Sequence, residues 1–162
     1  MPTIRMHTSA DYETIVRLMN ELQSYVASLD QLGKMRKISD FDAKKYVDHL
    51  LGKIQRDNGV IFVAEEQEKV AGFIAGTIPE ETEADLQDHY PIREGKIIEL
   101  VVTAQYRGKG VGQMLMEKIE EYFRAQECKF SRVGCFASNV SAHAFYKKCG
   151  YEDRYIEMLK KL

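Results

Sequence analysis

The chain has 162 residues, with 23 basic and 25 acidic side chains, so its formal net charge at pH 7 is only −2. A chain of this length is typical of a single domain, here residues 1–162, which buries about 70% of the surface that the unfolded chain exposes. Because the charge is nearly balanced, no basic field covers the chain, and we expect no binding to nucleic acid.

The N-terminal part predicts a strand followed by two amphipathic helices. It has no long apolar run, so we expect neither a signal peptide nor a membrane span. Residues 3–6 favour a short strand, and residues 8–11 are typical of a helix N-cap with an acid in the first turn. Two stretches then repeat apolar residues every three or four positions, which predicts one buried face on each helix. These residues are Ile15, Leu18, Met19, Leu22, Tyr25 and Val26, then Tyr46, Val47, Leu50, Leu51 and Ile54.

From residue 59 onward the pattern changes to β-branched and apolar runs. Residues 60–64 and 70–78 are rich in such side chains and are separated by a polar stretch, so they predict an antiparallel hairpin. After a polar, acidic connection, residues 97–102 (Ile-Ile-Glu-Leu-Val-Val) predict a central strand.

The last third of the chain predicts alternating helices and strands. We expect a helix from about Val111, a strand over residues 129–137, a helix over residues 139–148 and one or two closing strands within residues 151–159. Together with the N-terminal elements, this order predicts a mixed α/β fold, with a central sheet and helices on both of its faces.

The stretch 107–112, Arg-Gly-Lys-Gly-Val-Gly, joins the central strand to the following helix. Glycines let the backbone approach a ligand, a helix start offers unpaired N–H groups and a positive dipole end, and Arg107 and Lys109 add charge. The stretch therefore predicts a pyrophosphate-binding loop. It is neither a dinucleotide-binding turn, because Gln113 stands at the third glycine position, nor a P-loop, because Thr103 stands at the first.

The spacing Arg-x-x-Gly-x-Gly, together with the strand before it and residues 139–151 after it, resembles the GCN5-related N-acetyltransferase (GNAT) family. The specific motifs cover about the last two fifths of the chain, and before residue 90 only the order of elements agrees. The resemblance implies a mostly antiparallel sheet with a V-shaped split between its fourth and fifth strands, where acetyl-coenzyme A (acetyl-CoA) binds. It also implies direct acetyl transfer to a primary amine in a ternary complex, without a metal or a cysteine intermediate.

The resemblance further implies which residues hold the co-substrate. The exposed edge of the central strand is expected to pair with the pantetheine arm, and the loop amides are expected to hold the pyrophosphate. Asn139 is expected both to cap its helix and to hydrogen-bond the pantetheine arm. The expected strand and loop positions are Leu100, Val101, Val102, Arg107, Gly108, Lys109, Gly110, Val111, Gly112 and Gln113, with Gly110 and Gly112 the least replaceable.

Two side chains are candidates for the chemistry. Tyr146, seven residues after Asn139, matches the family's general acid for the leaving thiolate, and a backbone N–H near Val102 is expected to polarise the thioester carbonyl. Glu99 is the candidate general base, but strand alternation alone leaves open whether it faces the cleft or points away. The family's ribosomal N-terminal acetylases carry a glutamate where this chain has Gly134, which argues against a protein α-amine acceptor.

The sequence indicates less about the acetyl acceptor and the oligomeric state. Five acids precede the central strand, and they predict attraction of a polyamine-like, aminoglycoside-like or lysine acceptor unless they are merely solvated. The alternative to an enzyme is a non-catalytic acyl-CoA sensor of the same fold. A homodimer is compatible with exposed strands near the C-terminus. The acids are Glu80, Glu81, Glu83, Asp85 and Asp88.

Three cysteines, an odd number without close metal-ligand spacing, indicate reduced thiols, a cytoplasmic location and no metal. Cys135 and Cys149 are expected to be small buried hydrophobic residues rather than nucleophiles. The sequence therefore predicts that no thiol takes part in the chemistry.

Overall fold

The computed structural model describes residues 2–162 and is built on one five-stranded sheet. The strands lie side by side in chain order, and every neighbouring pair is antiparallel except the fourth and fifth strands, which are parallel. The predicted mixed α/β fold with a mostly antiparallel sheet is confirmed. The strands are β1 (Thr3–Met6), β2 (Val60–Glu66), β3 (Lys69–Thr77), β4 (Glu94–Val102) and β5 (Phe130–Arg132).

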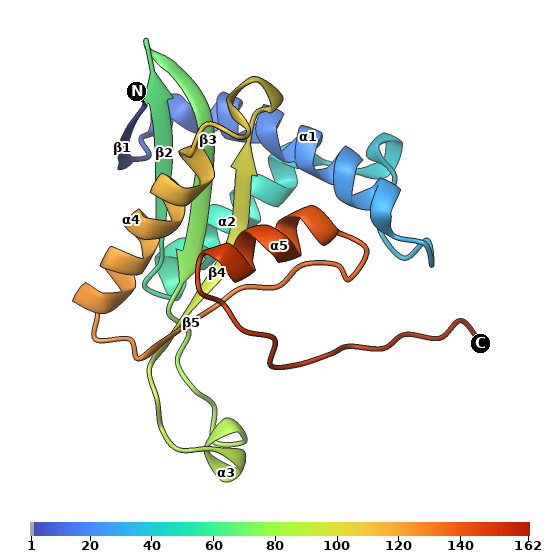
Figure 1. Ribbon diagram of the computed structural model, residues 1–162, viewed down its shortest axis with the longest axis vertical. Helices are drawn as coiled ribbons and strands as arrows, with labels where there is room; N and C mark the ends of the chain where they lie inside the picture. Colours follow the sequence, from blue (N-terminus) through green and yellow to red (C-terminus); the bar gives the residue numbers. More distant parts are fainter. Residues whose placement is uncertain (1) are drawn as a thin grey trace.

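Helices cover both faces of this sheet (Figure 1). The first two long helices pack on one face and the last two on the other, which gives two separate hydrophobic cores. The long helices are α1 (Tyr12–Leu29), α2 (Ala43–Arg56), α4 (Val111–Ala125) and α5 (Val140–Lys148). The short ones are α3 (Asp85–Asp88) and three 3-10 turns, Ser9–Asp11, Ile38–Asp40 and Ala104–Tyr106.

The apolar stripes predicted for α1 and α2 form most of the first core. Leu18 and Val47 are fully buried, as the three-to-four spacing predicts. Tyr25 is an exception, because it is 40% exposed and its hydroxyl lies 3.3 Å from Asn139 Oδ1. Its predicted place on the buried face is therefore wrong, and its ring instead reaches toward the start of α5.

An ion-pair network fixes the N-terminal strand to its neighbours. Arg5 donates to both oxygens of Asp11 at 2.8 and 2.9 Å, and also to Glu65 of β2. Asp11 is buried and accepts a further bond from the Thr8 N–H at 2.7 Å, as a capping residue does. The guanidinium of Arg5 is the main reason why the pKa of Asp11 falls to about 2.

A bulge interrupts the alternation of β4 at its middle. Ala75 of β3 pairs with Glu99, but the next residue, Gly76, pairs with Ile97, so Ile98 is an extra residue in β4. Ile98 packs on the core beneath α1 and α2, and Glu99 reaches Tyr46 of α2. The bulge thus turns two consecutive side chains toward the same face of the sheet.

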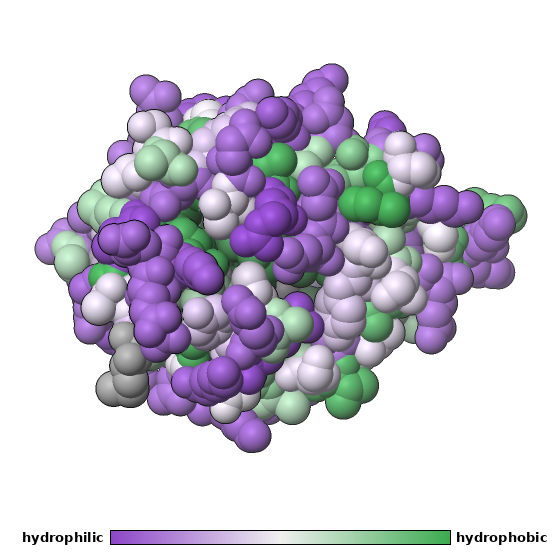
Figure 2. Space-filling model, turned by 90° about the horizontal axis from the view of Figure 1, so that it is seen from above, coloured by the Kyte–Doolittle hydropathy of each residue, from purple (hydrophilic) through white to green (hydrophobic). Residues whose placement is uncertain are grey.

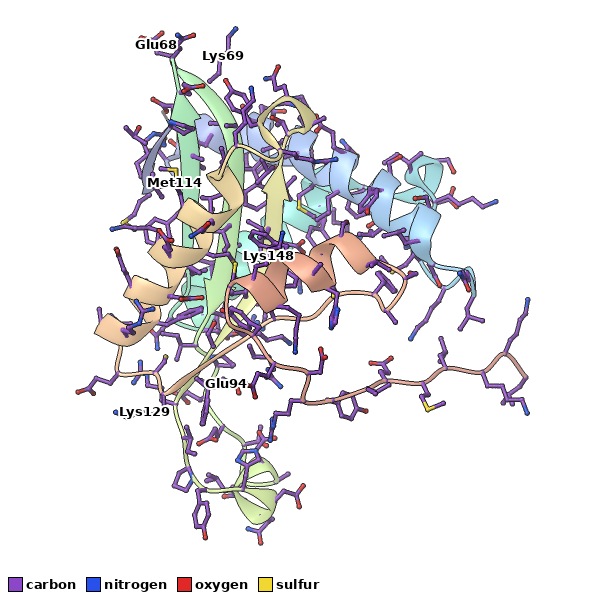
Figure 3. The ribbon with its side chains drawn as sticks, viewed as in Figure 1. Glu68, Lys69, Glu94, Met114, Lys129 and Lys148 are labelled. Carbon is purple, nitrogen blue, oxygen red and sulfur yellow. The ribbon has the colours of Figure 1, made fainter. Side chains whose placement is uncertain are left out.

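The parallel pairing between β4 and β5 covers only one end of β4. Residues 94–96 pair with residues 130–132, and beyond them the chain diverges from β4 and passes beneath α5 (Figure 1). Glu94 and Lys129 lie at this lower end in Figure 3. Within residues 2–162, no strand pairs with the outer edge of residues 97–102. The predicted V-shaped split between the fourth and fifth strands is confirmed.

The C-terminal part differs from the prediction in two respects. The strand predicted over residues 129–137 is only three residues long, and residues 151–159 contain no strand. Asp153 pairs with His143 at 2.6 Å and with Lys147 at 3.5 Å, so the chain after Gly150 is tied to α5 rather than paired beside β5. The last residues then run away from the sheet (Figure 1).

Candidate active site

The phosphate-binding loop predicted from the sequence starts α4 as expected. Gly110 is the N-cap residue with φ +82°, and Gly108 has φ +74°, both in the left-handed region that glycine tolerates best. Gly112 is constrained differently, because a Cβ there would lie 3.2 Å from Cζ of Phe145 in α5. Two glycines are thus needed for backbone conformation and one for packing.

The amides of this loop are free to bind an external acceptor. Within residues 2–162, no backbone or side-chain acceptor pairs with the N–H groups of residues 108–113. Three of these groups belong to the first turn of α4, where the helix dipole favours an anion. Lys109 and Arg107 are exposed beside them, although Arg107 Nε donates to the Val102 carbonyl at 2.9 Å. Seen from above, the surface at this end is mostly hydrophilic (Figure 2).

The open edge of β4 leads directly into this loop. Thr103 donates its N–H to Ala71 at 2.9 Å, on the β3 side. Because backbone polar groups alternate sides along a strand, Val101 also faces β3, whereas Leu100 and Val102 direct theirs toward the open edge. Of the three strand positions expected to meet the pantetheine arm, two therefore direct their backbone groups to the split, where the Val102 carbonyl already accepts from Arg107 Nε.

Glu99 lies beside this edge and contacts α2. Its carboxylate accepts a hydrogen bond from the Tyr46 hydroxyl, and its side chain is partly buried. Burial raises the pKa of Glu99 to about 7, although the bond from Tyr46 opposes this rise. A carboxyl group with this pKa changes its protonation state near neutral pH, as a general base requires.

Tyr146 approaches the same region from α5. Its ring lies 5.4 Å from that of Phe145 and 6.2 Å from that of Tyr151. Burial is the main cause that raises the pKa of Tyr146 to about 12, and the charges of Cys135 and Glu99 add to it. Within residues 2–162 its hydroxyl makes no hydrogen bond, so it is available to a ligand.

Asn139 joins α5 to α1 across the split. Its Oδ1 accepts from the Ala142 N–H at 3.2 Å, which confirms the predicted helix cap. Tyr25 and Ser141 donate to the same oxygen, and the neighbouring Ser138 donates to the Leu29 carbonyl at 2.9 Å. Within residues 2–162, the side-chain amide nitrogen of Asn139 makes no hydrogen bond, so it remains available for a second role.

The acidic connection before β4 projects beyond the lower end of the sheet, with α3 at its tip (Figure 1). Two of its five acids hold the connection itself together. Glu81 accepts from the Ile92 N–H at 3.2 Å, and Asp85 accepts from Thr82 at 2.7 and 2.8 Å. The side chains of Glu80, Glu83 and Asp88 make no hydrogen bond or ion pair within residues 2–162.

The cysteines are free thiols with raised pKa values. Cys135 is exposed, so its expected burial is wrong, whereas Cys128 and Cys149 are partly buried. Desolvation raises the pKa of all three, which keeps them protonated and poorly nucleophilic. Within residues 2–162 there is no group of three or more side chains suited to a metal, and no helix is long and apolar enough to span a membrane.

Two residues that contact the candidate site residues were not predicted from the sequence. The sequence places Tyr46 at one apolar position of a helical stripe, and it does not indicate that Phe145 packs against Gly112. A buried tyrosine hydroxyl needs a polar partner, so a tyrosine in an apolar stripe could have indicated Tyr46. Ile98 and its bulge lack any marker in the sequence.

Comparison with known proteins identifies the family of this chain. The acetyltransferase (GNAT) family matches residues 18–151, so the chain belongs to that family. An N-acetyltransferase of Archaeoglobus fulgidus is 30% identical over 147 residues, covering 88% of each chain. Glucosamine 6-phosphate N-acetyltransferase of Arabidopsis thaliana is 24% identical over 145 residues, covering 90% of this chain and 92% of the relative.

Two further comparisons bear on size and fold. The matched part of the chain spans about half the length of two N-acetyltransferases of Methanocaldococcus jannaschii, 53% and 48%. The crystal structure of a mutant of the BH1408 protein from Bacillus halodurans superposes with a TM-score of 0.85 at 21% identity, covering 99% of each chain. This likeness shows the fold over the covered part of the chain.

Proposed function

We propose that this chain is an acetyl-CoA-dependent N-acetyltransferase, which transfers an acetyl group to a primary amine by direct attack in a ternary complex. One observation carries the proposal. The unpaired edge of β4 runs into six consecutive amides without an internal acceptor, and a carboxyl group with a raised pKa lies partway along that edge. The edge and the amides suit the co-substrate, and the carboxyl group suits the amine.

The co-substrate has two kinds of group that match this surface. Its pyrophosphate would accept from the amides of residues 108–113 at the start of α4, with Lys109 nearby. Its pantetheine amides would pair with Leu100 and Val102, much as another strand would. The Val102 N–H would then also be able to polarise the thioester carbonyl. Asn139 would use its free amide nitrogen on the same arm.

The chemistry needs a proton acceptor and a group that stabilises the leaving sulfur. The amine nitrogen attacks the carbonyl carbon, a C–N bond forms and the C–S bond breaks. One proton leaves the ammonium before attack, a second leaves the nitrogen afterwards, and the sulfur takes up one. Glu99 is the proposed acceptor of the first proton, directly or through water, because its pKa of about 7 balances basicity against ionisation.

Tyr146 is the proposed group beside the leaving sulfur. Its pKa of about 12 lies above the ordinary thiol value of about 8.5, so in the free protein it retains its proton firmly. It would therefore act first as a hydrogen-bond donor to the developing thiolate, and proton transfer would follow as charge accumulates on sulfur. Its unpaired hydroxyl supports this role.

The acceptor is proposed as a small polyamine-like, aminoglycoside-like or lysine amine. The three unpaired acids Glu80, Glu83 and Asp88 would attract such cations at low ionic strength. One relative is named for glucosamine 6-phosphate, so an amino sugar phosphate belongs in the same panel of acceptors. Replacing the three acids by amides should raise KM for a polycationic amine. An unchanged KM would remove the steering argument and leave the transferase proposal intact.

Binding of the co-substrate can be tested before any acceptor is known. Coenzyme A should raise the melting temperature, whereas ATP and NAD should not, because neither carries the pantetheine arm that matches β4. The amide resonances of residues 108–113 should shift on addition of coenzyme A. Unshifted loop amides would contradict the proposed site. A homodimer and a cytoplasmic location stay predictions.

A non-catalytic acyl-CoA sensor would pass this binding test as well. It would differ in turnover, because it would bind acetyl-CoA without releasing thiol in the presence of any amine. The raised pKa of Glu99 and the unpaired Tyr146 hydroxyl favour the enzyme, since a sensor needs neither.

A further inference from the structure

We propose that Tyr46 is a positioning residue for the transfer, and that its hydroxyl holds the Glu99 carboxylate in place and stabilises its charged form. The proposal rests on the proposed function, in which Glu99 is the proton acceptor. Tyr46 lies on α2 and not on the strand or the loop that form the co-substrate site. It would therefore act through Glu99.

The local structure of α2 fixes the position of Tyr46. Asp42 caps the helix by accepting from the Lys45 N–H at 3.0 Å, and its carbonyl accepts from the Tyr46 N–H at 3.0 Å. The ring of Phe41 packs against that of Tyr46 with centroids 5.6 Å apart. A capped first turn and an aromatic neighbour together restrict where the hydroxyl can lie.

The hydroxyl is the one hydrogen-bond donor to Glu99 that the described chain provides. Tyr46 donates to Oε1, and within residues 2–162 no other group bonds to either carboxylate oxygen. Oε2 is therefore free to face an ammonium or a bridging water. A single bond to one oxygen orients a carboxylate without occupying the other, which is what a general base needs.

The register of β4 makes this contact possible. Glu99 pairs with Ala75 of β3 and alternates with Val101, and both of these residues lie in the core beneath α1 and α2, so Glu99 lies on the same face of the sheet. The bulge brings Ile98 to this face as well, where strict alternation would direct it to the opposite one. The register and the tyrosine together bring a carboxylate to α2 beside the open edge.

The groups around Glu99 determine whether removal of the Tyr46 hydroxyl raises or lowers the pKa of Glu99. On α5, Tyr146 is a neutral phenol whose pKa is raised mainly by burial and in part by the charge of Glu99, and the partner of Glu99 on β3 is Ala75. Within residues 2–162, no lysine, arginine or histidine contributes to its pKa, which burial raises and the Tyr46 bond lowers. Removing the hydroxyl removes the opposing effect, so the pKa of Glu99 should rise further.

The first test follows the carboxyl group itself. In protein labelled with 13C at glutamate side-chain carboxyls, the resonance that disappears in Glu99→Gln belongs to Glu99, and it can be titrated without co-substrate. Tyr46→Phe should move its midpoint up by about one pH unit, the effect expected of a hydrogen bond to a charged group. Tyr12→Phe is a matched control, because Tyr12 donates to Asp48 at 2.8 Å away from Glu99. It should leave the midpoint unchanged.

The second test follows turnover. With an active amine, the acidic limb of the pH profile of kcat/KM should move to higher pH by the same amount in Tyr46→Phe. The loss of kcat/KM should therefore be about tenfold at pH values below the limb and small above it. In the background of Glu99→Gln, the Tyr46→Phe change should have almost no further effect, because both residues act through one group.

The outcomes separate this inference from the proposed function. An unmoved Glu99 midpoint in Tyr46→Phe, or a loss of rate that is equal at every pH, would overturn the role of Tyr46 while leaving the transferase intact. A shifted midpoint in a protein that acetylates no amine would instead overturn the proposed function. An intact melting temperature in Tyr46→Phe shows that the fold is retained.

Discussion

Gly112 at the start of α4 and Phe145 of α5 are packed so closely that a Cβ on Gly112 would lie 3.2 Å from Cζ of Phe145. This contact joins the loop whose amides are free to the helix that carries Tyr146. We therefore expect a change at the loop to affect the proposed acid through the Phe145 ring.

Gly112→Ala should consequently affect both binding and chemistry. The added methyl group displaces Phe145, and overpacking of this kind costs about 1 to 3 kcal/mol of stability. We expect a higher KM for acetyl-CoA together with a lower kcat, measured in steady-state kinetics. Gly52→Ala is the control, because a Cβ at Gly52 in α2 meets no atom within 4 Å. It should be neutral or slightly stabilising, and equal kinetics in both variants would contradict the coupling.

Glu99→Gln should lower kcat by about 10²-fold or more near neutral pH, because general-base catalysis contributes on that order. The glutamine can still accept a bond from Tyr46 but cannot take up a proton. The wild-type profile should show an acidic limb near the pKa of about 7, and the variant should lack it. A kcat that survives the substitution at every pH would mean that the amine is deprotonated elsewhere.

The same substitution should change stability in a pH-dependent way. The folded-state pKa of Glu99, about 7, lies above its ordinary value of 4.5, so the folded protein favours the protonated form. The free energy of unfolding of the wild type should therefore fall relative to that of Glu99→Gln as the pH rises from about 4.5 through 7, by about 3 kcal/mol in all. Urea unfolding at about pH 4 and pH 8 measures this difference. A gap that stays constant would show that the carboxyl group is not held in a desolvated site.

Asp11 should show the opposite dependence. Its pKa of about 2 in the folded protein lies below the ordinary 3.8, so its contribution is present above 3.8 and is lost as the pH falls through 2. Asp11→Asn should cost about 2 kcal/mol at neutral pH, and the cost should shrink as the solution is acidified below about pH 4. Chemical denaturation of both proteins across this range tests the network around Arg5. If acid leaves the difference unaltered, the carboxylate is not the stabilising form.

Periodicity and motif spacing were sufficient for those features that depend on neighbouring residues. Leu18 and Val47 are buried as their helical spacing requires, and Gly110 caps α4 where the glycine pattern predicts. The cap by Asn139 was likewise readable, because a capping residue and its helix are adjacent in sequence. Local rules therefore predicted the elements and the position of the loop.

Features that depend on residues far apart in the sequence could not be predicted from the sequence. Ile98 and Leu100 are both apolar, and nothing between them marks a bulge, so the orientation of Glu99 depended on pairing with β3. The sequence predicts strands within residues 151–159, but a strand needs a partner, and Asp153 ties this segment to His143. Tyr46 has the spacing of a core residue, and only the tertiary structure brings its hydroxyl to a carboxylate.

Thiol release from acetyl-CoA, measured against a panel of polyamines, aminoglycosides, lysine derivatives and amino sugar phosphates with detection of the acetylated product, tests the central claim most directly. The account predicts that at least one primary amine is acetylated with one thiol released for each product, and that the rate collapses in Glu99→Gln while coenzyme A still binds. Firm binding of coenzyme A without an acetylated amine, or equal rates in the wild type and Glu99→Gln, would contradict it.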